Sequence, residues 1–434
     1  MSKNRKINIV TLGCSKNVVD SEFLMKQLDF DGWEVIHDSD DTSAKVVVIN
    51  TCGFIADAKE ESTDTILRFV NAKIQGVIDK VYVMGCLSQR YKSELEQEIP
   101  EVDGFYGVTD LPEILKDLKS KYTQEVANRR ILTTPKHYAY LKISEGCNLG
   151  CAYCAIPLIR GKHISRTIES LMDEAAQLAN DGVKELLIIA QDSTYYGLDI
   201  YGKRMLPDLI QKLSEINGIE WIRIHYAYPS NFPLDLIDVI RSNPKVCKYI
   251  DIPFQHISNN MLKIMRRGLD KTETIELVNK LRSDIPNIAI RTTFLVGHPG
   301  ETEQDFNELL DFVKTSKFDR VGVFTYSEEE GTYAANNHPD TISEEIKNRR
   351  LEALMELQQE ISLKNNADKV GQILKVIVDR FEDQYIVGRT EFDSPEVDQE
   401  VLVINDKIKK IQLGDFIDVK ITSSEDYDLI GEIQ

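Results

Sequence analysis

Cysteines with unusual spacing mark where this sequence could do chemistry. Three of its seven cysteines, Cys147, Cys151 and Cys154, fall within the stretch EGCNLGCAYCAIP at residues 145–157. Thiolate sulfur is a soft ligand that suits iron–sulfur clusters and zinc. A loop with this spacing can hold three irons of a cubane cluster and leave the fourth iron open to a substrate or cofactor. Zinc stays open as an alternative, although structural zinc generally needs a fourth protein ligand.

Three further cysteines each follow a separate apolar stretch near the amino terminus. Cys14 ends INIVTLGC, Cys52 ends AKVVVINTC and Cys86 ends KVYVMGC. Helical periodicity follows each stretch, at about residues 17–28, about 57–70, and from near Tyr91 onward. Strands that alternate with helices indicate a parallel sheet, whose carboxyl strand ends share one edge. The pattern predicts that the three thiols meet there, although any one such cysteine is more often a core residue.

The middle of the chain carries six strand candidates separated by helical patterns. They are residues 138–144, 185–191, 221–228, 248–255, 288–296 and 320–326. Six consecutive βα units predict an open, TIM-like barrel or a wide doubly wound sheet, with functional groups at the strand carboxyl ends. The three-cysteine loop follows the first of these strands. Cys247 stands apart from the other cysteines in VCKYIDI, so we expect it in the core.

The pattern of predicted elements changes in the last quarter of the chain. A capped start at Ser343 predicts a long helix to about residue 366, and about five short strands after Gly371 predict a small antiparallel β-barrel of the oligonucleotide-binding kind. From residue 370 onward seven Lys and Arg stand against fifteen Asp and Glu, a net charge of −8. The expected domains are residues 1–125, 137–340 and 369–434, with a linker helix at 341–368.

Length and charge narrow the class of protein. At 434 residues the chain is too long for a disulfide-stapled miniature, and its formal charge of −19 disfavours a phosphate-binding surface. An odd cysteine count in special spacings favours metal or catalytic thiols in a reducing compartment. No apolar stretch approaches the length of a membrane span, and no signal-peptide pattern opens the chain. These features predict a cytoplasmic location.

The stretch CNLGCAYCAIP resembles the signature of the radical S-adenosylmethionine (radical SAM) superfamily, including Tyr153 before the third cysteine. The resemblance implies that Cys147, Cys151 and Cys154 hold a 4Fe–4S cluster. Its open iron would chelate S-adenosylmethionine, and an electron from the cluster would cleave that cofactor to a 5′-deoxyadenosyl radical. The protein would then orient the cofactor and exclude water.

The stretches TLGCSKN, NTCGF and MGCLSQR resemble the amino-terminal domain of the radical SAM methylthiotransferases. This resemblance implies a second 4Fe–4S cluster on Cys14, Cys52 and Cys86, and it covers the whole chain, with a TRAM domain as the final barrel. AQDSTYYG, IHYAYP, DIPFQHIS and YSEEEGTYAA look like the branch that modifies an aspartate β-carbon of the twelfth small-subunit ribosomal protein. The acidic final barrel favours the same branch, because it would attract a basic ribosomal protein and repel tRNA.

The family pattern also implies residues that bind S-adenosylmethionine. LVGHPGET at 295–302 would contact its adenine and ribose, with Gly297 and Gly300 permitting close approach and Glu301 beside them. The residues alone favour an ordinary βα turn there. Further candidates for cofactor binding are Tyr153 in the cysteine loop, Gln191 and Asp192 at the end of the second strand, and Arg291 within the fifth.

Other polar residues have weaker claims. A lone His256 is more often a hydrogen-bonded structural group than a catalytic one. Arg160 and Arg166 could contact an acidic substrate side chain, but exposure at the surface is their default expectation. Residues expected near the substrate on the third strand are His225, Tyr226 and Tyr228.

Two rival functions stay open. One is a tRNA adenosine methylthiotransferase, and the other is a non-catalytic iron–sulfur protein that relays electrons without consuming S-adenosylmethionine. The expected partners of the enzyme are the basic ribosomal substrate and an electron donor such as ferredoxin or flavodoxin. The sequence does not identify the sulfur donor, and any contact with nucleic acid would be indirect.

Overall fold

The computed structural model describes residues 5–404 and 410–434, which fold as two compact units. Unit 1 contains residues 1–134, 140–149 and 155–177, and unit 2 contains residues 135–139, 150–154 and 178–434. The cysteine loop therefore passes from unit 1 into unit 2 after residue 149 and returns after residue 154. Within the described ranges, no helix is both long enough and apolar enough to cross a membrane.

Unit 1 is built on a five-stranded parallel sheet in the order β2-β1-β3-β4-β5. The strands are β1 (Lys6–Thr11), β2 (Glu34–His37), β3 (Val46–Thr51), β4 (Lys80–Gly85) and β5 (Gly104–Phe105). Apolar side chains from alternate strand positions form a separate core on each face, because successive residues of a strand point to opposite faces. The sequence predicted β1, β3 and β4. The two edge strands, β2 and β5, were not predicted, because they are short and carry little periodicity.

Helices connect these strands. They are α1 (Ser15–Phe30), α2 (Ala56–Ile74), α3 (Cys86–Glu98) and α4 (Leu111–Asp117), followed by the 3-10 turn η1 (Gln124–Val126). The expected start of the third helix near Tyr91 was wrong, since α3 begins at Cys86 itself. Gly85 has φ +103°, a conformation that other residues rarely adopt, and it turns the chain from β4 directly into the helix. Tyr91 is a non-helical kink within α3, which displaced the apparent periodicity.

The rest of unit 1 comes from the middle of the chain. It comprises most of β6 (Tyr138–Lys142), the short hairpin strands β7 (Ser144–Glu145) and β8 (Ile164–Ser165), α5 (Ile156–Ile159) and most of α6 (Ile168–Asn180). Strands β7 and β8 pair in an antiparallel manner.

The sheet of unit 2 follows the chain order β13-β12-β11-β10-β9-β6, with only the first residues of β6 belonging to this unit. Its other strands are β9 (Glu185–Ile189), β10 (Trp221–Ile224), β11 (Val246–Asp251), β12 (Ala289–Val296) and β13 (Arg320–Thr325). Strands β9 to β13 pair with their neighbours in a parallel manner. The six predicted strands are thus confirmed, in the order that successive βα units produce.

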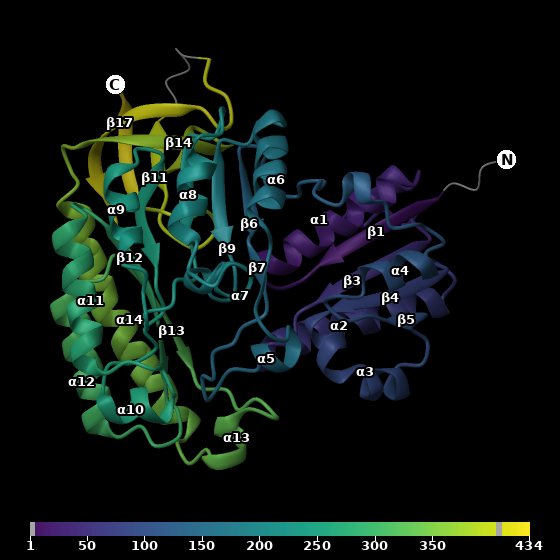
Figure 1. The fold of residues 1–434 in the computed structure, drawn as a ribbon, viewed down its shortest axis with the longest axis horizontal. Helices are drawn as coiled ribbons and strands as arrows, with labels where there is room; N and C mark the ends of the chain where they lie inside the picture. Colours follow the sequence, from purple (N-terminus) through teal and green to yellow (C-terminus); the bar gives the residue numbers. More distant parts are fainter. Residues whose placement is uncertain (1–4, 405–409) are drawn as a thin grey trace. The chain divides into compact units, whose positions relative to one another are not determined.

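Helices of unit 2 pack along this sheet (Figure 1). The connecting elements are η2 (Ser193–Tyr195), α7 (Leu198–Tyr201), α8 (Leu206–Ser214), α9 (Asp235–Ser242), α10 (Asn259–Ile264), α11 (Lys271–Asp284), α12 (Glu303–Ser316) and α13 (Tyr333–Asn337). The long predicted helix is α14 (Glu344–Ala367), and Ser343 caps it by accepting a hydrogen bond from the Ile346 N–H.

The final segment is the predicted closed barrel, in the order β14-β15-β16-β18-β17. Its strands are β14 (Ile373–Glu382), β15 (Tyr385–Thr390), β16 (Val401–Ile404), β17 (Phe416–Ser424) and β18 (Leu429–Ile433). Alternate residues of these strands, such as Val376, Val378, Val401 and Val403, fill its interior.

A buried ion-pair network joins the barrel to the sheet within unit 2. Glu185 of β9 pairs with Arg223 of β10 at 2.8 Å and with Arg389 of β15 at 2.6 Å, and Arg389 also pairs with Asp379 at 2.7 Å. Arg223 Nη1 donates to the Glu391 carbonyl at 2.7 Å. Burial of these charges is tolerated because each one is paired.

Candidate active site

The three strand-end cysteines of unit 1 lie on neighbouring strands. Cys14 is the N-cap of α1 and follows β1, Cys52 follows β3, and Cys86 begins α3 directly after β4. Strands β1, β3 and β4 are adjacent and parallel, so the three cysteines occupy the same edge of the sheet. The structure therefore brings together the residues that the strand pattern predicted.

Glycines let the three cysteine turns approach closely. A Cβ atom on Gly13 would lie 2.7 Å from the Cβ of Cys52. A Cβ on Gly53 would lie 2.6 Å from the Leu87 Cα and 3.0 Å from the carbonyl carbon of Cys86. Any larger residue at either glycine would push the turns apart. This close packing and the soft donor set fit an iron–sulfur cluster held by Cys14, Cys52 and Cys86.

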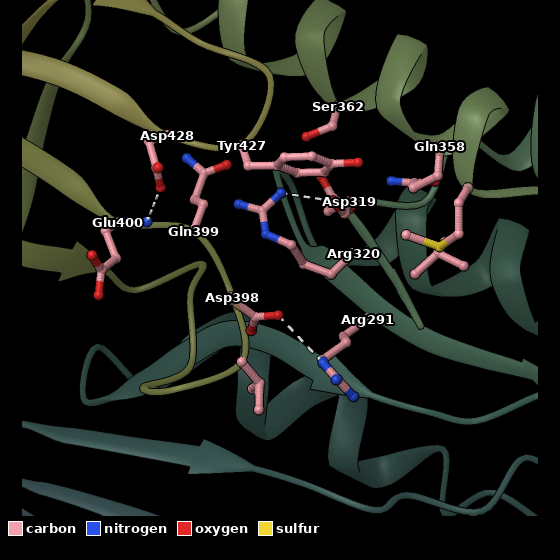
Figure 2. A pocket seen from close by; sticks show the side chains of 13 residues that line it. Arg291, Asp319, Arg320, Gln358, Ser362, Asp398, Gln399, Glu400, Tyr427 and Asp428 are labelled. Carbon is pink, nitrogen blue, oxygen red and sulfur yellow. Dashed lines mark hydrogen bonds and ion pairs between the residues drawn. The ribbon is translucent and has the colours of Figure 1, made fainter. Parts of the chain in front are cut away.

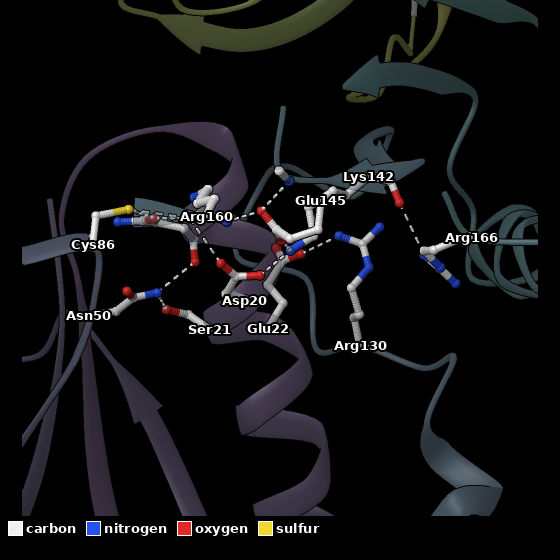
Figure 3. A network of polar contacts seen from close by, with 12 residues as sticks. Asp20, Ser21, Glu22, Asn50, Cys86, Arg130, Lys142, Glu145, Arg160 and Arg166 are labelled. Atoms are coloured by element: carbon white, nitrogen blue, oxygen red, sulfur yellow. Dashed lines mark hydrogen bonds and ion pairs between the residues drawn. The ribbon is translucent and has the colours of Figure 1, made fainter. Parts of the chain in front are cut away.

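Asn17 and Arg160 organise this edge, and Figure 3 shows Arg160 beside Cys86. Asn17 Nδ2 donates to the carbonyls of Leu12, at 2.9 Å, and Thr51, at 3.0 Å, which precede two of the cysteine turns. Arg160 Nη2 donates to Asn17 Oδ1 at 2.6 Å and lies 3.5 Å from Cys86 Sγ. The default expectation that Arg160 lies at the surface was wrong, because its side chain is buried. Tertiary contacts place it there, and the local sequence carries no sign of them.

Burial dominates the electrostatics of these thiols. It raises the pKa of the Cys86 thiol to about 12, although the Arg160 guanidinium acts in the opposite direction. Burial likewise raises the pKa of Cys52. Metal ligation requires the thiolate, so a bound cluster would release these protons.

Within residues 5–404 and 410–434, no three His, Cys, Asp or Glu side chains gather closely enough to bind one metal ion. The cysteines of a cubane cluster bind separate irons, so they need not converge on a single point.

The central cysteine loop contributes to both units. In unit 1, the Cys147 N–H donates to the Gly161 carbonyl at 3.0 Å, and the Leu149 N–H donates to Cys147 Sγ at 3.4 Å. In unit 2, the Cys154 N–H donates to the Cys151 carbonyl at 3.2 Å. Each backbone contact fixes part of the loop, as a cluster-binding loop requires.

Arg267 is a residue near this loop that sequence reasoning missed. Its Nη1 lies 3.2 Å from Cys151 Sγ and 3.2 Å from the Tyr153 hydroxyl, and its guanidinium stacks over the Tyr228 ring at 4.5 Å. Arg267 is buried and stands 113 positions beyond Cys154, so no local spacing could have revealed it. Tyr228 has its hydroxyl 3.7 Å from Cys151 Sγ, and its expected place near the substrate stays a prediction.

The turn after β12 is held by buried charges. Glu301 accepts hydrogen bonds from the Gly297 N–H and from Arg350 Nη1 at 2.9 Å, and its other oxygen lies 3.2 Å from His256 Nε2. His256 is thus the hydrogen-bonded structural group that the sequence favoured. With its carboxylate taken up in this way, Glu301 shapes the turn. Its predicted contact with S-adenosylmethionine stays a prediction.

Contacts within the protein require glycine at position 297. Its φ is +73°, and a Cβ there would lie 2.3 Å from the Lys347 side chain of α14. Gly300 also has a positive φ, +90°, with Ile264 beside it. The close approach of protein at Gly297 was not anticipated, and the role of both glycines toward the cofactor stays a prediction.

The remaining candidates separate in space. Gln191 is half-buried after β9, whereas Arg291 lies near the start of β12 and pairs with Asp251 at 3.2 Å and Asp398 at 3.3 Å. His225 is buried, with Nε2 3.1 Å from the Ser394 hydroxyl. Arg291 faces the final barrel, so its ion pairs favour a structural role.

Arg291 also lines the cavity shown in Figure 2, which has a volume of about 460 Å³. Residues from β13, α14 and the loops of the final barrel form its other walls, including Arg320, Gln358, Gln399 and Tyr427. This cavity contains none of the cysteines, so it is distinct from the cysteine sites.

Three family models match the chain in the order that the sequence predicted. The Radical SAM superfamily model matches residues 141–313, the model described as uncharacterized protein family UPF0004 matches residues 6–107, and the TRAM domain model matches residues 370–433. Together with the parallel sheet and the cysteine loop, these matches define a radical SAM enzyme with a carboxy-terminal TRAM domain.

Curated relatives align along the whole chain. "Ribosomal protein uS12 methylthiotransferase RimO" of Bacteroides thetaiotaomicron is 55% identical, with 99% of each chain covered. The protein of the same name from Cytophaga hutchinsonii is 54% identical, covering 100% of this chain and 98% of its own length. This chain belongs to the RimO family of ribosomal protein uS12 methylthiotransferases.

Solved structures with lower identity support the fold alone. The radical S-adenosylmethionine methyltransferase TsrM of Kitasatospora setae, solved with cobalamin and a 4Fe–4S cluster, matches with a TM-score of 0.57 at 15% identity. The match covers 77% of this chain and 74% of that chain. The cobalamin-dependent radical enzyme OxsB matches with a TM-score of 0.53 at 13% identity, over 81% of this chain and 56% of its own.

Proposed function

We propose that this protein attaches a methylthio group to ribosomal protein uS12, at the β-carbon of an aspartate. The observation that carries this proposal is identity of 52–56% along essentially the full length of relatives named as uS12 methylthiotransferases. The cysteine loop and the cysteines of the amino-terminal sheet provide the ligands that such chemistry needs.

The six predicted cluster ligands divide between two sites. Cys147, Cys151 and Cys154 would hold a 4Fe–4S cluster that supplies an electron to bound S-adenosylmethionine. A second site on the sheet edge of unit 1 would hold an auxiliary cluster, through Cys14, Cys52 and Cys86.

The protein's own residues serve geometry more than proton transfer. Reaction at an unactivated carbon requires the reacting atoms to be held at near-attack distances, because no nearby acid or base can labilise the C–H bond. Buried side chains such as Arg267 and Asn17 fix the cysteine turns by hydrogen bonds, which limits the freedom of any cluster bound to them.

Charge supports a protein substrate over tRNA. The segment from residue 370 carries a net charge of −8, and the whole chain carries −19. An acidic surface attracts a basic ribosomal protein and repels a phosphate backbone. The net charge therefore favours the protein substrate over the tRNA adenosine alternative.

The electron donor of the proposed reaction would be a ferredoxin or flavodoxin, and the enzyme would act in the cytoplasm, where its ribosomal substrate is made. These partners follow from the reaction class, since each turnover of S-adenosylmethionine cleavage consumes an external electron.

Mass spectrometry of uS12 from cells with and without the gene tests the function. We expect a methylthio mass gain on one aspartate that disappears in the deletion strain and returns with the wild-type gene but not with a Cys147→Ala variant. If uS12 is unchanged while a tRNA adenosine loses its methylthio group, the substrate assignment is wrong. If neither molecule changes and purified protein forms no 5′-deoxyadenosine, the electron-relay alternative gains support.

A further inference from the structure

Arg160 contacts Cys86 of the amino-terminal sheet and Glu145, which lies two residues before Cys147 (Figure 3). Its Nη2 lies 3.5 Å from Cys86 Sγ, on the amino-terminal sheet. The residue that follows it, Gly161, accepts the hydrogen bond from the Cys147 N–H at 3.0 Å. One short segment thus connects a ligand of the proposed auxiliary cluster with a ligand of the proposed radical cluster.

The guanidinium is held firmly in this orientation. Nη1 donates to Glu145 Oε1 at 2.7 Å, and Nη2 donates to Asn17 Oδ1 at 2.6 Å and Asp20 Oδ2 at 3.2 Å. Lys142 binds the same two carboxylates, with its Nζ 2.7 Å from Glu145 Oε2. Because two acids face two bases, the network is neutral before any thiolate is counted.

Because this network is neutral, the charge of Arg160 can act on the neighbouring Cys86 sulfur. Asp20 and Glu145 are shared with Lys142. The two hydrogens of Nη2 face three acceptors, Asn17 Oδ1, Asp20 Oδ2 and Cys86 Sγ, so the sulfur lies directly beside the positive charge. A buried guanidinium beside a cluster sulfur stabilises the added negative charge of the reduced cluster, and hydrogen bonds to ligand sulfur tune its potential.

We infer that Arg160 is a positioning residue that orients Cys86 and raises the reduction potential of the auxiliary cluster. The inference rests on the proposed function, because it requires a cluster on Cys14, Cys52 and Cys86. It extends that function by linking the segment after the radical-cluster loop to the auxiliary site. A shift of the backbone at Gly161 would move the neighbouring Arg160 side chain and so change its contact with Cys86.

The test uses the full-length protein with Cys147, Cys151 and Cys154 all replaced by Ala, so that only the auxiliary site can load. After anaerobic reconstitution with iron and sulfide, we measure bound iron and the midpoint potential in a redox titration followed by electron paramagnetic resonance. In this background, Arg160→Gln should shift the potential to more negative values and lower iron affinity about 10-fold. Arg160→Lys keeps the charge and should restore part of both.

Arg166→Gln is the matched control. Arg166 forms an ion pair with Glu174 and donates a hydrogen bond to the Ser170 hydroxyl in the same unit. It should leave potential and iron affinity unchanged. Thermal melting of the apo forms compares folding among all the variants.

The outcomes separate the inference from the function. A potential and an iron affinity that are both unaffected by Arg160→Gln would overturn the inference while leaving the cluster in place. Equal losses in the Arg160 and Arg166 variants would also overturn it, since they would reflect general folding. If the triple-alanine parent binds no cluster at all, the auxiliary site of the proposed function fails and the inference fails with it.

Discussion

Arg267 Nη1 lies 3.2 Å from Cys151 Sγ, inside unit 2. Its other terminal nitrogen donates to the Pro253 carbonyl at 2.6 Å, so the guanidinium cannot turn away from the cysteine. Burial alone would lower the pKa of Arg267, but the neighbouring Tyr153 and Cys151 hold it above its ordinary value. A permanent positive charge therefore stands beside one predicted ligand of the radical cluster.

Replacing Arg267 with Gln should weaken the radical-cluster site. The variant loses the charge beside Cys151 and the stacking on Tyr228, and removal of such an outer partner typically costs about 10- to 100-fold in metal affinity or activity. The measurements are iron content and 5′-deoxyadenosine formation from S-adenosylmethionine with a chemical reductant. Arg266→Gln is the control, since Arg266 is exposed and stacks on Tyr333. Equal activity of the two variants would contradict the role given to Arg267.

The hydrophobic pattern of the sequence predicted most of the strands and helices. Strands such as β3 and β9 contain continuous apolar runs, as buried parallel strands commonly do, so the sequence could locate them. The short edge strands β2 and β5 carry too few residues for a pattern. The start of α3 was misplaced because Gly85 turns the chain abruptly and Tyr91 interrupts the helix.

The sequence predicted that the strand-end cysteines meet, but it did not predict which charged residues lie beside the cysteines. Cysteines at strand ends meet because parallel strands share an edge, which is a rule of topology. Arg160 and Arg267 reach Cys86 and Cys151 through tertiary packing across 74 and 116 positions, respectively. No periodicity or local spacing encodes such a contact. The expectation that Arg160 is exposed, which rests on the usual position of arginine, was therefore wrong.

Replacing Glu301 with Ala should destabilise unit 2. The change leaves Arg350 and His256 without the carboxylate that they share in a buried site. Removal of one partner from a buried ion pair typically costs about 3–5 kcal/mol. We expect a clear fall in the melting temperature of the apo protein, with a smaller fall for Glu301→Gln, which keeps the hydrogen-bonding shape. A melting temperature unchanged by Glu301→Ala would show that this carboxylate is not needed to hold the turn after β12.

Acid should loosen the junction of the sheet and the barrel. Burial acts to raise the pKa of Glu185, but Arg389 and Arg223 outweigh it and lower that pKa from 4.5 to about 2. A folded-state pKa below the unfolded value means that the ionised side chain stabilises the fold above pH 4.5. This stability is lost as the pH falls from 4.5 toward 2.

The shift at Glu185 corresponds to roughly 3 kcal/mol. Thermal melting of the apo protein from pH 7 down to pH 3 should show a declining midpoint below about pH 5. Glu185→Gln should melt lower at pH 7 and decline less steeply in acid, because the titrating group is gone. The exposed Glu220 provides the control, and Glu220→Gln should follow the wild-type curve. Parallel curves for Glu185→Gln and wild type would contradict the assignment.

Recognition of uS12 should depend on the acidic barrel. Asp418, Glu425 and Glu432 are exposed on or beside its strands β17 and β18. Their replacement by Gln removes three of the fifteen acids of this segment without disturbing its interior. At low salt, kcat/KM for uS12 should fall several-fold, chiefly through slower association, because complementary charge steers the encounter.

At high salt the wild type and the triple variant should have similar kcat/KM values for uS12, because salt screens the charges that speed association of the wild type. Steady-state kinetics with purified uS12 at two salt concentrations measure the effect. Formation of 5′-deoxyadenosine without uS12 serves as the internal control and should be equal in both proteins. A triple variant that modifies uS12 as fast as wild type at low salt would show that binding does not use the barrel, and the charge argument for a basic substrate would then lose its structural basis.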